Sequence, residues 1–175
     1  VLRLQGKLDD ALKSYEAALS INGNHVGSHC GKGDVLRFQG KFDEALKSYE
    51  AALLIDPNHL ASHFGTGEVL RGQGNLDHAL VFYEEVLLID PNHLASHYCK
   101  GEVLRIQGNL DDALKSYEAA LSINPNHLVS HCGKGDALRL QGKLDAALES
   151  YNRALEINRT HKGSLTGKRD ILIFQ

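Results

Sequence analysis

The sequence predicts an all-α protein in which one pair of helices is copied along the chain. The main observation is a period of 34 residues that links tyrosines, glycines, alanines and histidines. These residues are Tyr15, Tyr49, Tyr83, Tyr117 and Tyr151; Gly6, Gly40, Gly74, Gly108 and Gly142; Ala11, Ala45, Ala79, Ala113 and Ala147; and His25, His59, His93, His127 and His161. Residues 1–25 also match residues 103–127 at all but three positions. A period of this length is typical of solenoids, and no segment has the alternating pattern of a strand.

Composition indicates a globular chain and argues against two classes of partner. The 175 residues are 42% apolar and 23% charged, which is typical of folded domains. A net charge of −3 is not that of a nucleic-acid-binding protein. No run of apolar residues is long enough to span a membrane, and Lys7, Asp9 and Asp10 come too early for a signal peptide. The chain has no Met and opens at Val1, so we expect a piece of a longer or processed polypeptide.

Residues 60–93 show how one copy is built from two helices. The second helix is amphipathic, with apolar residues spaced three and four apart at Leu76, Ala79, Leu80, Tyr83, Val86 and Leu87. The first helix has an apolar or small stripe at Leu60, Phe64, Gly67 and Leu70.

The ends of these two helices carry residues typical of helix boundaries. Gly74 is expected to end the first helix in a left-handed conformation. Asp77 is expected in the first turn of the second helix, where its charge favours the helix dipole. Asp90 and Pro91 are expected to start the next copy, with Asp90 as the N-cap and Pro91 in the first turn.

This pattern resembles the tetratricopeptide repeat over the whole chain. That family has a small residue at position 8, Ala at 20, an aromatic at 24, Ala at 27 and Pro at 32. With position 1 at Val26, Leu60, Leu94 and Leu128, position 8 is Gly33, Gly67, Gly101 and Gly135, and positions 20 and 24 are the alanine and tyrosine series. Position 27 is Ala18, Ala52, Ala120 and Ala154, and position 32 is Pro57, Pro91 and Pro125. His29, His63, His97 and His131 depart from the usual Trp at position 4.

The resemblance implies a right-handed superhelical solenoid of antiparallel helix pairs. We expect a single array with a partial repeat at 1–25, whole repeats at 26–59, 60–93, 94–127 and 128–161, and a partial repeat at 162–175. Position 8 must be small so that the two helices approach closely, and the tyrosine at position 24 should fill the gap opposite. Both ends break inside a first helix, at Val1–Gln5 and after Ile171-Leu172-Ile173-Phe174. The second of these is too apolar for a capping repeat, so we expect further repeats or contacts with another chain there.

The resemblance also implies a concave groove lined by first-helix positions that include 5, 9 and 12. The groove residues predicted from these positions are Asp34, Arg37, Phe64, Glu68, Arg71, Tyr98, Glu102, Arg105, Asp136 and Arg139. Acid and arginine lie three residues apart and can pair on one helix face. Two interpretations stay open and are compatible: a solvated ladder of ion pairs, or a peptide groove with arginine forks and with Phe64 and Tyr98 as apolar anchors.

The histidines and cysteines are the side chains in this sequence best suited to bind a metal or act as a nucleophile. Four H-x-x-x-H pairs, His25/His29, His59/His63, His93/His97 and His127/His131, have a spacing that can chelate Zn, Ni or Cu. The alternative, which we prefer, is that position 4 packs between helix pairs and position 34 lies at the helix start, with no metal bound. Cys30, Cys99 and Cys132 are expected to be partly buried thiols in a reducing compartment rather than a catalytic thiol. Asn158 begins an N-glycosylation sequon.

The predicted function is therefore a protein–protein interaction scaffold that binds an extended or helical peptide in the groove. Every candidate catalytic residue recurs with the 34-residue period, whereas a catalytic site is expected to occur once. We therefore expect no enzyme activity and no cofactor. We expect a cytoplasmic protein with a protein or peptide partner, no nucleic acid and no membrane, and self-association through open ends. The two alternatives are a structural protein that assembles head to tail into filaments and the repeat region of a larger enzyme.

Overall fold

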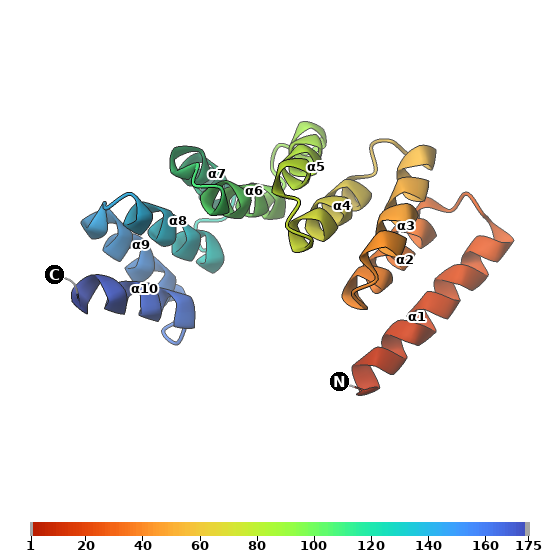
Figure 1. The fold of residues 1–175 in the computed structure, drawn as a ribbon, viewed down its shortest axis with the longest axis horizontal. Helices are drawn as coiled ribbons and strands as arrows, with labels where there is room; N and C mark the ends of the chain where they lie inside the picture. Colours follow the sequence, from red (N-terminus) through yellow and green to blue (C-terminus); the bar gives the residue numbers. More distant parts are fainter. Residues whose placement is uncertain (1, 174–175) are drawn as a thin grey trace. The chain divides into compact units, whose positions relative to one another are not determined.

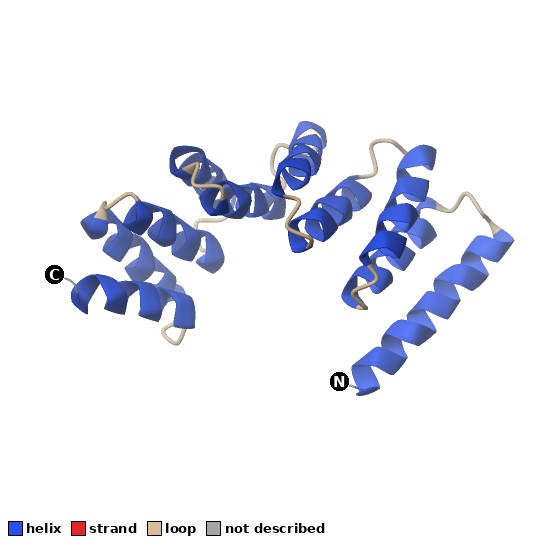
Figure 2. Cartoon of the chain, viewed as in Figure 1, coloured by secondary structure: helices blue, strands red, loops and turns tan. Residues whose placement is uncertain are grey.

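The computed structural model describes the backbone of residues 2–173 and the side chains of residues 6–173. These residues form ten α-helices joined by short turns, with no strand among them (Figures 1 and 2). The chain divides into two compact units, residues 1–90 and 91–175. Unit 1 holds α1 (Leu2–Ile21), α2 (Val26–Phe38), α3 (Phe42–Ile55), α4 (Leu60–Gly72) and α5 (Leu76–Ile89). Unit 2 holds α6 (Leu94–Ile106), α7 (Leu110–Ile123), α8 (Leu128–Leu140), α9 (Leu144–Ile157) and α10 (Lys162–Ile173).

Each unit is a stack of helix hairpins. In unit 1, α2 pairs with α3 and α4 pairs with α5, while α1 packs on α2, and α3 packs on α4. In unit 2, α6 pairs with α7 and α8 pairs with α9, while α7 packs on α8, and α10 covers α8 and α9. The predicted all-α repeat solenoid is thus confirmed. Each helix pair buries one face against its neighbour, as repeat proteins do.

The turn inside each hairpin depends on a glycine, as the sequence predicts. Gly74 has a φ of +77°, a conformation that a residue with a Cβ adopts only with strain. Its N–H donates to the Arg71 carbonyl at 3.0 Å, and the Asn75 N–H donates to the Leu70 carbonyl at 2.8 Å. These bonds form a Schellman motif that ends α4 and satisfies its last carbonyls. Asp77 lies in the first turn of α5, also as predicted.

The turn between copies differs from the prediction for Asp90 and Pro91. Asp90 is the C-cap of α5, and the N-cap of the following helix is His93. The His93 Nδ1 accepts a hydrogen bond from the Ser96 N–H at 3.2 Å. At the equivalent turn in unit 1, the Asp56 carboxylate accepts from the Asn58 N–H, which makes a local turn instead of a helix cap. The aspartate therefore lies three residues too early in the chain to cap the helix.

The N-terminal copy also differs from the prediction. Residues 2–5 do not form a separate half helix, because α1 runs without a break from Leu2 to Ile21 through Gly6. Gly6 is absent from the glycines with positive φ, which are Gly40, Gly74, Gly108 and Gly142. Five residues cannot form a stable helix alone, so continuing α1 keeps hydrogen bonds that a turn would lose. At the other end, Ile171 is buried in α10, and Phe174 lies outside the described residues.

The close helix approach rests on glycines that face the periodic tyrosines. A Cβ added to Gly33 or Gly65 would lie 2.6 Å or 2.5 Å from a ring carbon of Tyr49. Gly101 and Gly133 enclose Tyr117 in the same way, at 2.7 Å each. The rings are completely buried. The predicted role of the tyrosine, to fill the gap opposite small residues, is what the packing shows.

Candidate functional site

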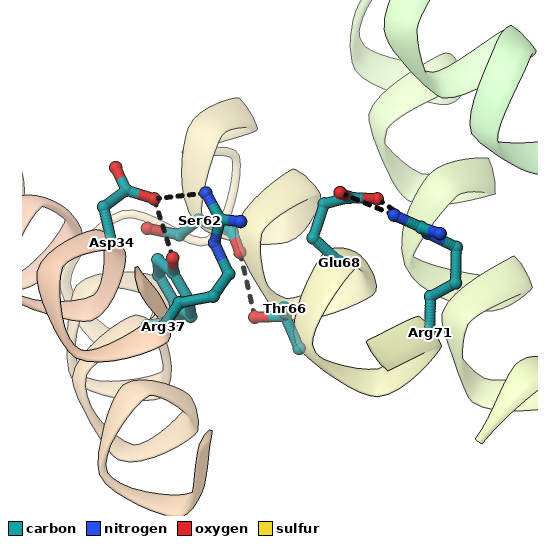
Figure 3. Close-up of polar contacts among 7 residues, drawn as sticks. Asp34, Arg37, Ser62, Thr66, Glu68 and Arg71 are labelled. Carbon is teal, nitrogen blue, oxygen red and sulfur yellow. Dashed lines mark hydrogen bonds and ion pairs between the residues drawn. The ribbon is translucent and has the colours of Figure 1, made fainter. Parts of the chain in front are cut away.

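In unit 1 the acidic residues of the first helices are held by two partners each. The Asp34 carboxylate accepts a hydrogen bond from the Tyr49 hydroxyl at 2.7 Å and lies 3.7 Å from an Arg37 nitrogen. In the next copy, the Tyr83 hydroxyl donates to Glu68 at 2.6 Å. Arg71 donates two bonds of 3.0 Å to the same carboxylate, as Figure 3 shows. Each acid is thus fixed between a core tyrosine and an arginine.

Unit 2 repeats this arrangement. The Tyr117 hydroxyl donates to Glu102 at 2.5 Å, and Arg105 donates to the other oxygen of that carboxylate at 2.9 Å. The Tyr151 hydroxyl donates to Asp136 at 2.6 Å. We call the groups at Asp34, Glu68 and Glu102 the tyrosine–acid–arginine clamps. Asp136 keeps the tyrosine hydrogen bond, but among the described residues it forms no ion pair with Arg139.

The clamps change the ionisation of their members. Burial, followed by the hydrogen bond and charge of Asp34, raises the pKa of Tyr49 far above its usual range. Burial and then the charge of Glu102 do the same to the pKa of Tyr117. For Arg105, burial by itself lowers the pKa, but the hydrogen bond and charge of Glu102 outweigh it and raise the pKa. The tyrosines therefore stay neutral and the arginine stays charged throughout the ordinary pH range.

The tyrosines are the part of this site that sequence reasoning missed. The acid–arginine spacing predicts pairing, and the structure pairs Glu68 with Arg71 and Glu102 with Arg105. The pairs are solvated to different degrees, because the Glu68 and Glu102 side chains are only 16% and 20% exposed, whereas the Asp34 side chain is 45% exposed. The signal available in the sequence was the constant separation of 15 residues between each acid and its tyrosine.

The two aromatic residues predicted as anchors lie partly in the core. Phe64 and Tyr98 are half-buried, and each ring packs on the core tyrosine of its own hairpin, with centroids 5.9 Å from Tyr83 and 6.3 Å from Tyr117. At the same repeat position, Cys30 and Cys132 are buried. Position 5 therefore offers part of an aromatic ring to solvent and uses the rest for packing.

The histidine pairs have local structural partners. His93 and His127 each place Nδ1 within 2.9 Å and 2.7 Å of a serine hydroxyl at the helix start, as expected for position 34. His97 and His131 place Nε2 2.9 Å from the backbone carbonyl of the preceding proline. Within the described side chains, no three His, Cys, Asp or Glu residues come together in a way that could hold a metal ion.

The thiols are buried rather than activated. Cys30, Cys99 and Cys132 are buried, and none of them forms a disulfide. Burial raises the pKa of the Cys30 thiol and of the Cys132 thiol. A nucleophilic cysteine needs the opposite shift, because the thiolate is the reactive form.

Stacked helix hairpins with clamped acids along their first helices define an all-α repeat protein of the solenoid class. The sequence profile of one such family, described as "Tetratricopeptide repeat", matches residues 26–91 and 93–160. The chain belongs to this family. No curated protein matches it in sequence.

Several solved structures share the fold. The crystal structure of MamA has a TM-score of 0.81 and 22% identity, and covers 90% of this chain and 92% of that chain. YrrB, described as a TPR protein with an unusual peptide-binding site, has a TM-score of 0.79 and 24% identity, with 96% and 87% covered. A tetratricopeptide repeat protein from Parabacteroides merdae has a TM-score of 0.83 and 23% identity, with 96% and 67% covered. Identities this low show similarity of fold alone. Over residues 2–173, no helix has the length and apolarity needed to cross a membrane.

Proposed function

We propose that the chain is a protein-interaction scaffold whose first helices bind an extended or helical peptide. The binding face of unit 1 comprises Asp34, Arg37, Phe64, Glu68 and Arg71, and that of unit 2 comprises Tyr98, Glu102, Arg105, Asp136 and Arg139. Its family and its fold support a scaffold role in general. We keep a cytoplasmic location as part of the proposal, since all three cysteines are free.

The observation that carries this proposal is a partly exposed aromatic ring beside a fixed charged pair. Phe64 and Glu68 are four residues apart on α4, so they share one helix face. The carboxylate is already oriented by Tyr83 and Arg71, and a preorganised polar group loses little entropy when a ligand binds. Aromatic residues and arginine are the types most enriched at interaction hot spots.

The proposal is tested with a paired binding titration. A partner captured by the wild-type chain and identified by mass spectrometry is titrated against Phe64→Ala/Tyr98→Ala and against Leu88→Ser. The aromatic double variant should lose about 2–4 kcal/mol of binding free energy, the range for anchor removal. Leu88 is 78% exposed on α5, where the equivalent residue of α7 is Ser122, so this control should bind normally.

The same variants also test the assignment of the aromatic rings. Circular dichroism should show the double variant folded and less destabilised than Tyr83→Ala, because Tyr83 is fully buried while Phe64 is not. If the double variant unfolds, the rings belong to the core. If it stays folded and binds its partner unchanged, the partner uses another surface.

A second role, self-association, is favoured by one observation on α10. Leu165, Leu172 and Ile173 are 46%, 55% and 66% exposed on this helix. Exposed apolar side chains on one element favour association. Light scattering of the wild type against Leu165→Lys/Leu172→Lys tests this role, and a wild-type monomer at high concentration would contradict it.

A further inference from the structure

The repeat at 60–93 departs from its neighbours on the side of α4 away from the proposed peptide face. Thr66 stands where the other copies have Lys32, Lys100, Lys134 and Lys168, and Phe82 stands where they have Ser14, Ser48, Ser116 and Ser150. Thr66 is two residues from both Phe64 and Glu68, which is about 200° around a helix axis. These substitutions therefore change a different surface from the tyrosine–acid–arginine clamps.

In three other copies the lysine at this position reaches across to the second helix of the preceding copy. Lys32 pairs with Glu16 at 3.0 Å, and Lys134 pairs with Glu118 at 2.8 Å. Lys168 donates to Asn152 at 2.7 Å, where the acid is absent. The lysine stem is partly buried there, since the side chain is only 27–28% exposed in the two ion pairs.

Thr66 cannot form such an ion pair, because its side chain is short and uncharged. Its hydroxyl donates to the Ser62 carbonyl of its own helix at 2.9 Å, as Figure 3 shows. The acid that its lysine would pair with is Glu50, which is exposed on α3. Among the described residues, none donates a hydrogen bond to Glu50 and none forms an ion pair with it. The surface of α3 therefore carries an acid without the cation that pairs with the equivalent acids Glu16 and Glu118.

A cleft of about 460 Å³ lies between α3 and α5, with α4 as its floor and Thr66 in place of the lysine. Leu46, Leu53 and Leu54 line the α3 side, Leu70 the floor, and Phe82 the α5 side. Leu54 is 79% exposed. Glu50 is the one carboxylate that lines this cleft. We call it the α3–α5 cleft.

We propose that the α3–α5 cleft binds an amphipathic peptide helix that presents apolar side chains and one lysine or arginine. The apolar side chains enter between Leu54 and Phe82, and the cation pairs with Glu50 in place of the missing lysine. This site goes beyond the proposed peptide face, because it uses the second helices and the opposite side of α4. A groove flanked by two helices, with a ladder of leucines, suits a third helix with anchors at i, i+3 or i+4, and i+7.

The negative charge of Glu50 favours a peptide helix that carries a lysine or arginine. An apolar trough alone accepts many partners, but Glu50 makes an acidic partner unfavourable and a basic one favourable. The volume is within the range of ligand pockets, and the apolar residues of α3 extend over two helical turns, from Leu46 to Leu54. An anionic membrane surface would meet the Glu50 carboxylate with like charge.

The test uses two synthetic peptides of about 15 residues, long enough to form a helix when bound. Both carry leucines at i, i+4 and i+7; one carries lysines on the flanking positions and the other carries glutamates. Fluorescence anisotropy should show that the lysine peptide binds the wild-type chain at least about tenfold more tightly than the glutamate peptide. Amide chemical shifts of α3 and α5 should change on binding.

Three variants, of which two restore the residues of the other copies, should weaken binding without unfolding the chain. Thr66→Lys supplies the internal cation for Glu50 and fills the cleft, and Phe82→Ser removes an apolar wall without changing the net charge. Each should lower affinity for the lysine peptide by about tenfold or more. Glu50→Gln should lower it by about three- to tenfold, because it removes only the charge.

The matched control is Lys134→Thr in unit 2, which frees Glu118 but leaves Ser150 in place of the phenylalanine. It should not alter affinity for the lysine peptide. Equal binding of both peptides, or undiminished binding by Thr66→Lys and Phe82→Ser, would overturn the proposal. Loss of binding in Phe64→Ala/Tyr98→Ala alone would place the peptide on the first-helix face instead. A dimer of the unmixed wild-type chain that Thr66→Lys dissociates would show that a second copy fills the cleft.

Discussion

The α3–α5 cleft of unit 1 and its counterpart between α7 and α9 of unit 2 occupy the same place in the repeat but have opposite chemistry. The counterpart has a volume of about 370 Å³ and is lined by charged residues that include Glu118, Lys134, Glu149 and Arg153. The Lys134–Glu118 ion pair crosses it. In unit 1 the equivalent cleft is lined mainly by leucines and Phe82, together with Thr66, Asn75 and His78, and Glu50 is left unpaired.

The packing beneath the two clefts is the same. Tyr49 and Tyr117 are completely buried, and each is enclosed by two glycines at distances that leave no room for a side chain. Both tyrosines donate to an acid of their own hairpin. The repeats thus keep the residues that set the distance between helices. Repeat positions 7 and 23 can differ, because the hairpins pack with Thr66 or a lysine at the first and with Phe82 or a serine at the second.

The largest expected effect tests whether the two cores are equivalent. Tyr49→Ala and Tyr117→Ala should each lower the free energy of unfolding by about 3–5 kcal/mol, because both remove a fully buried aromatic ring. The two losses should agree closely. Urea unfolding followed by circular dichroism measures them, and a difference of several kcal/mol would show that the cores differ as much as the clefts.

A smaller effect is expected from adding one methyl group beside these rings. Gly65→Ala and Gly133→Ala should each cost about 1–2 kcal/mol, because the new Cβ would overlap a tyrosine ring that cannot move away, which outweighs the gain in helix propensity. Gly72→Ala, also on α4, is the control. Its Cβ would lie 3.8 Å from Phe42, so it should raise stability by about 0.5 kcal/mol. Thermal unfolding of all three variants tests this contrast, and a stable Gly65→Ala would contradict the tight fit.

A loss of unfolding free energy of similar size per tyrosine is expected at alkaline pH. The raised pKa of Tyr49 and of Tyr117 means that the unfolded chain loses these protons first, near pH 10, while the folded chain keeps them. Stability is therefore full below pH 10 and falls above it, by up to about 1.4 kcal/mol per pH unit for each tyrosine. Tyr49→Phe and Tyr117→Phe should each reduce the slope of stability against pH equally. Denaturant titrations at several pH values measure the slopes, and unequal changes would separate the two clamps.

The smallest expected change in the free energy of unfolding comes from substitutions in the two clefts. Thr66→Lys should raise the free energy of unfolding by about 0.5 kcal/mol through a new pair with Glu50, and Lys134→Thr should lower it by about the same amount. Adding Glu50→Gln to Thr66→Lys should remove the gain. High-precision thermal melts at low and high salt measure these changes. A gain that persists in high salt would come from packing of the lysine stem rather than from charge.

Particular residues show how far sequence reasoning reached. The glycine at 74 predicted a helix end that the structure confirms, because a positive φ is a local requirement. The aspartate at 90 predicted an N-cap and was wrong, since a competing local turn and a histidine three residues later satisfied the helix start instead. Gly6 follows the same period as Gly74 but lies within a continuous helix, so the period alone does not decide where a helix ends.

The sequence by itself determined the repeat, its two helices, the family and the pairing of acid with arginine, because each depends on residues less than one repeat apart on a regular helix. Only the tertiary structure decided which hydroxyl each acid accepts from, how deeply Phe64 and Tyr98 lie, and that Thr66 and Phe82 line the same cleft. These features join side chains on different helices. Their contacts depend on the distance and crossing of helix axes, which no local pattern in the chain specifies.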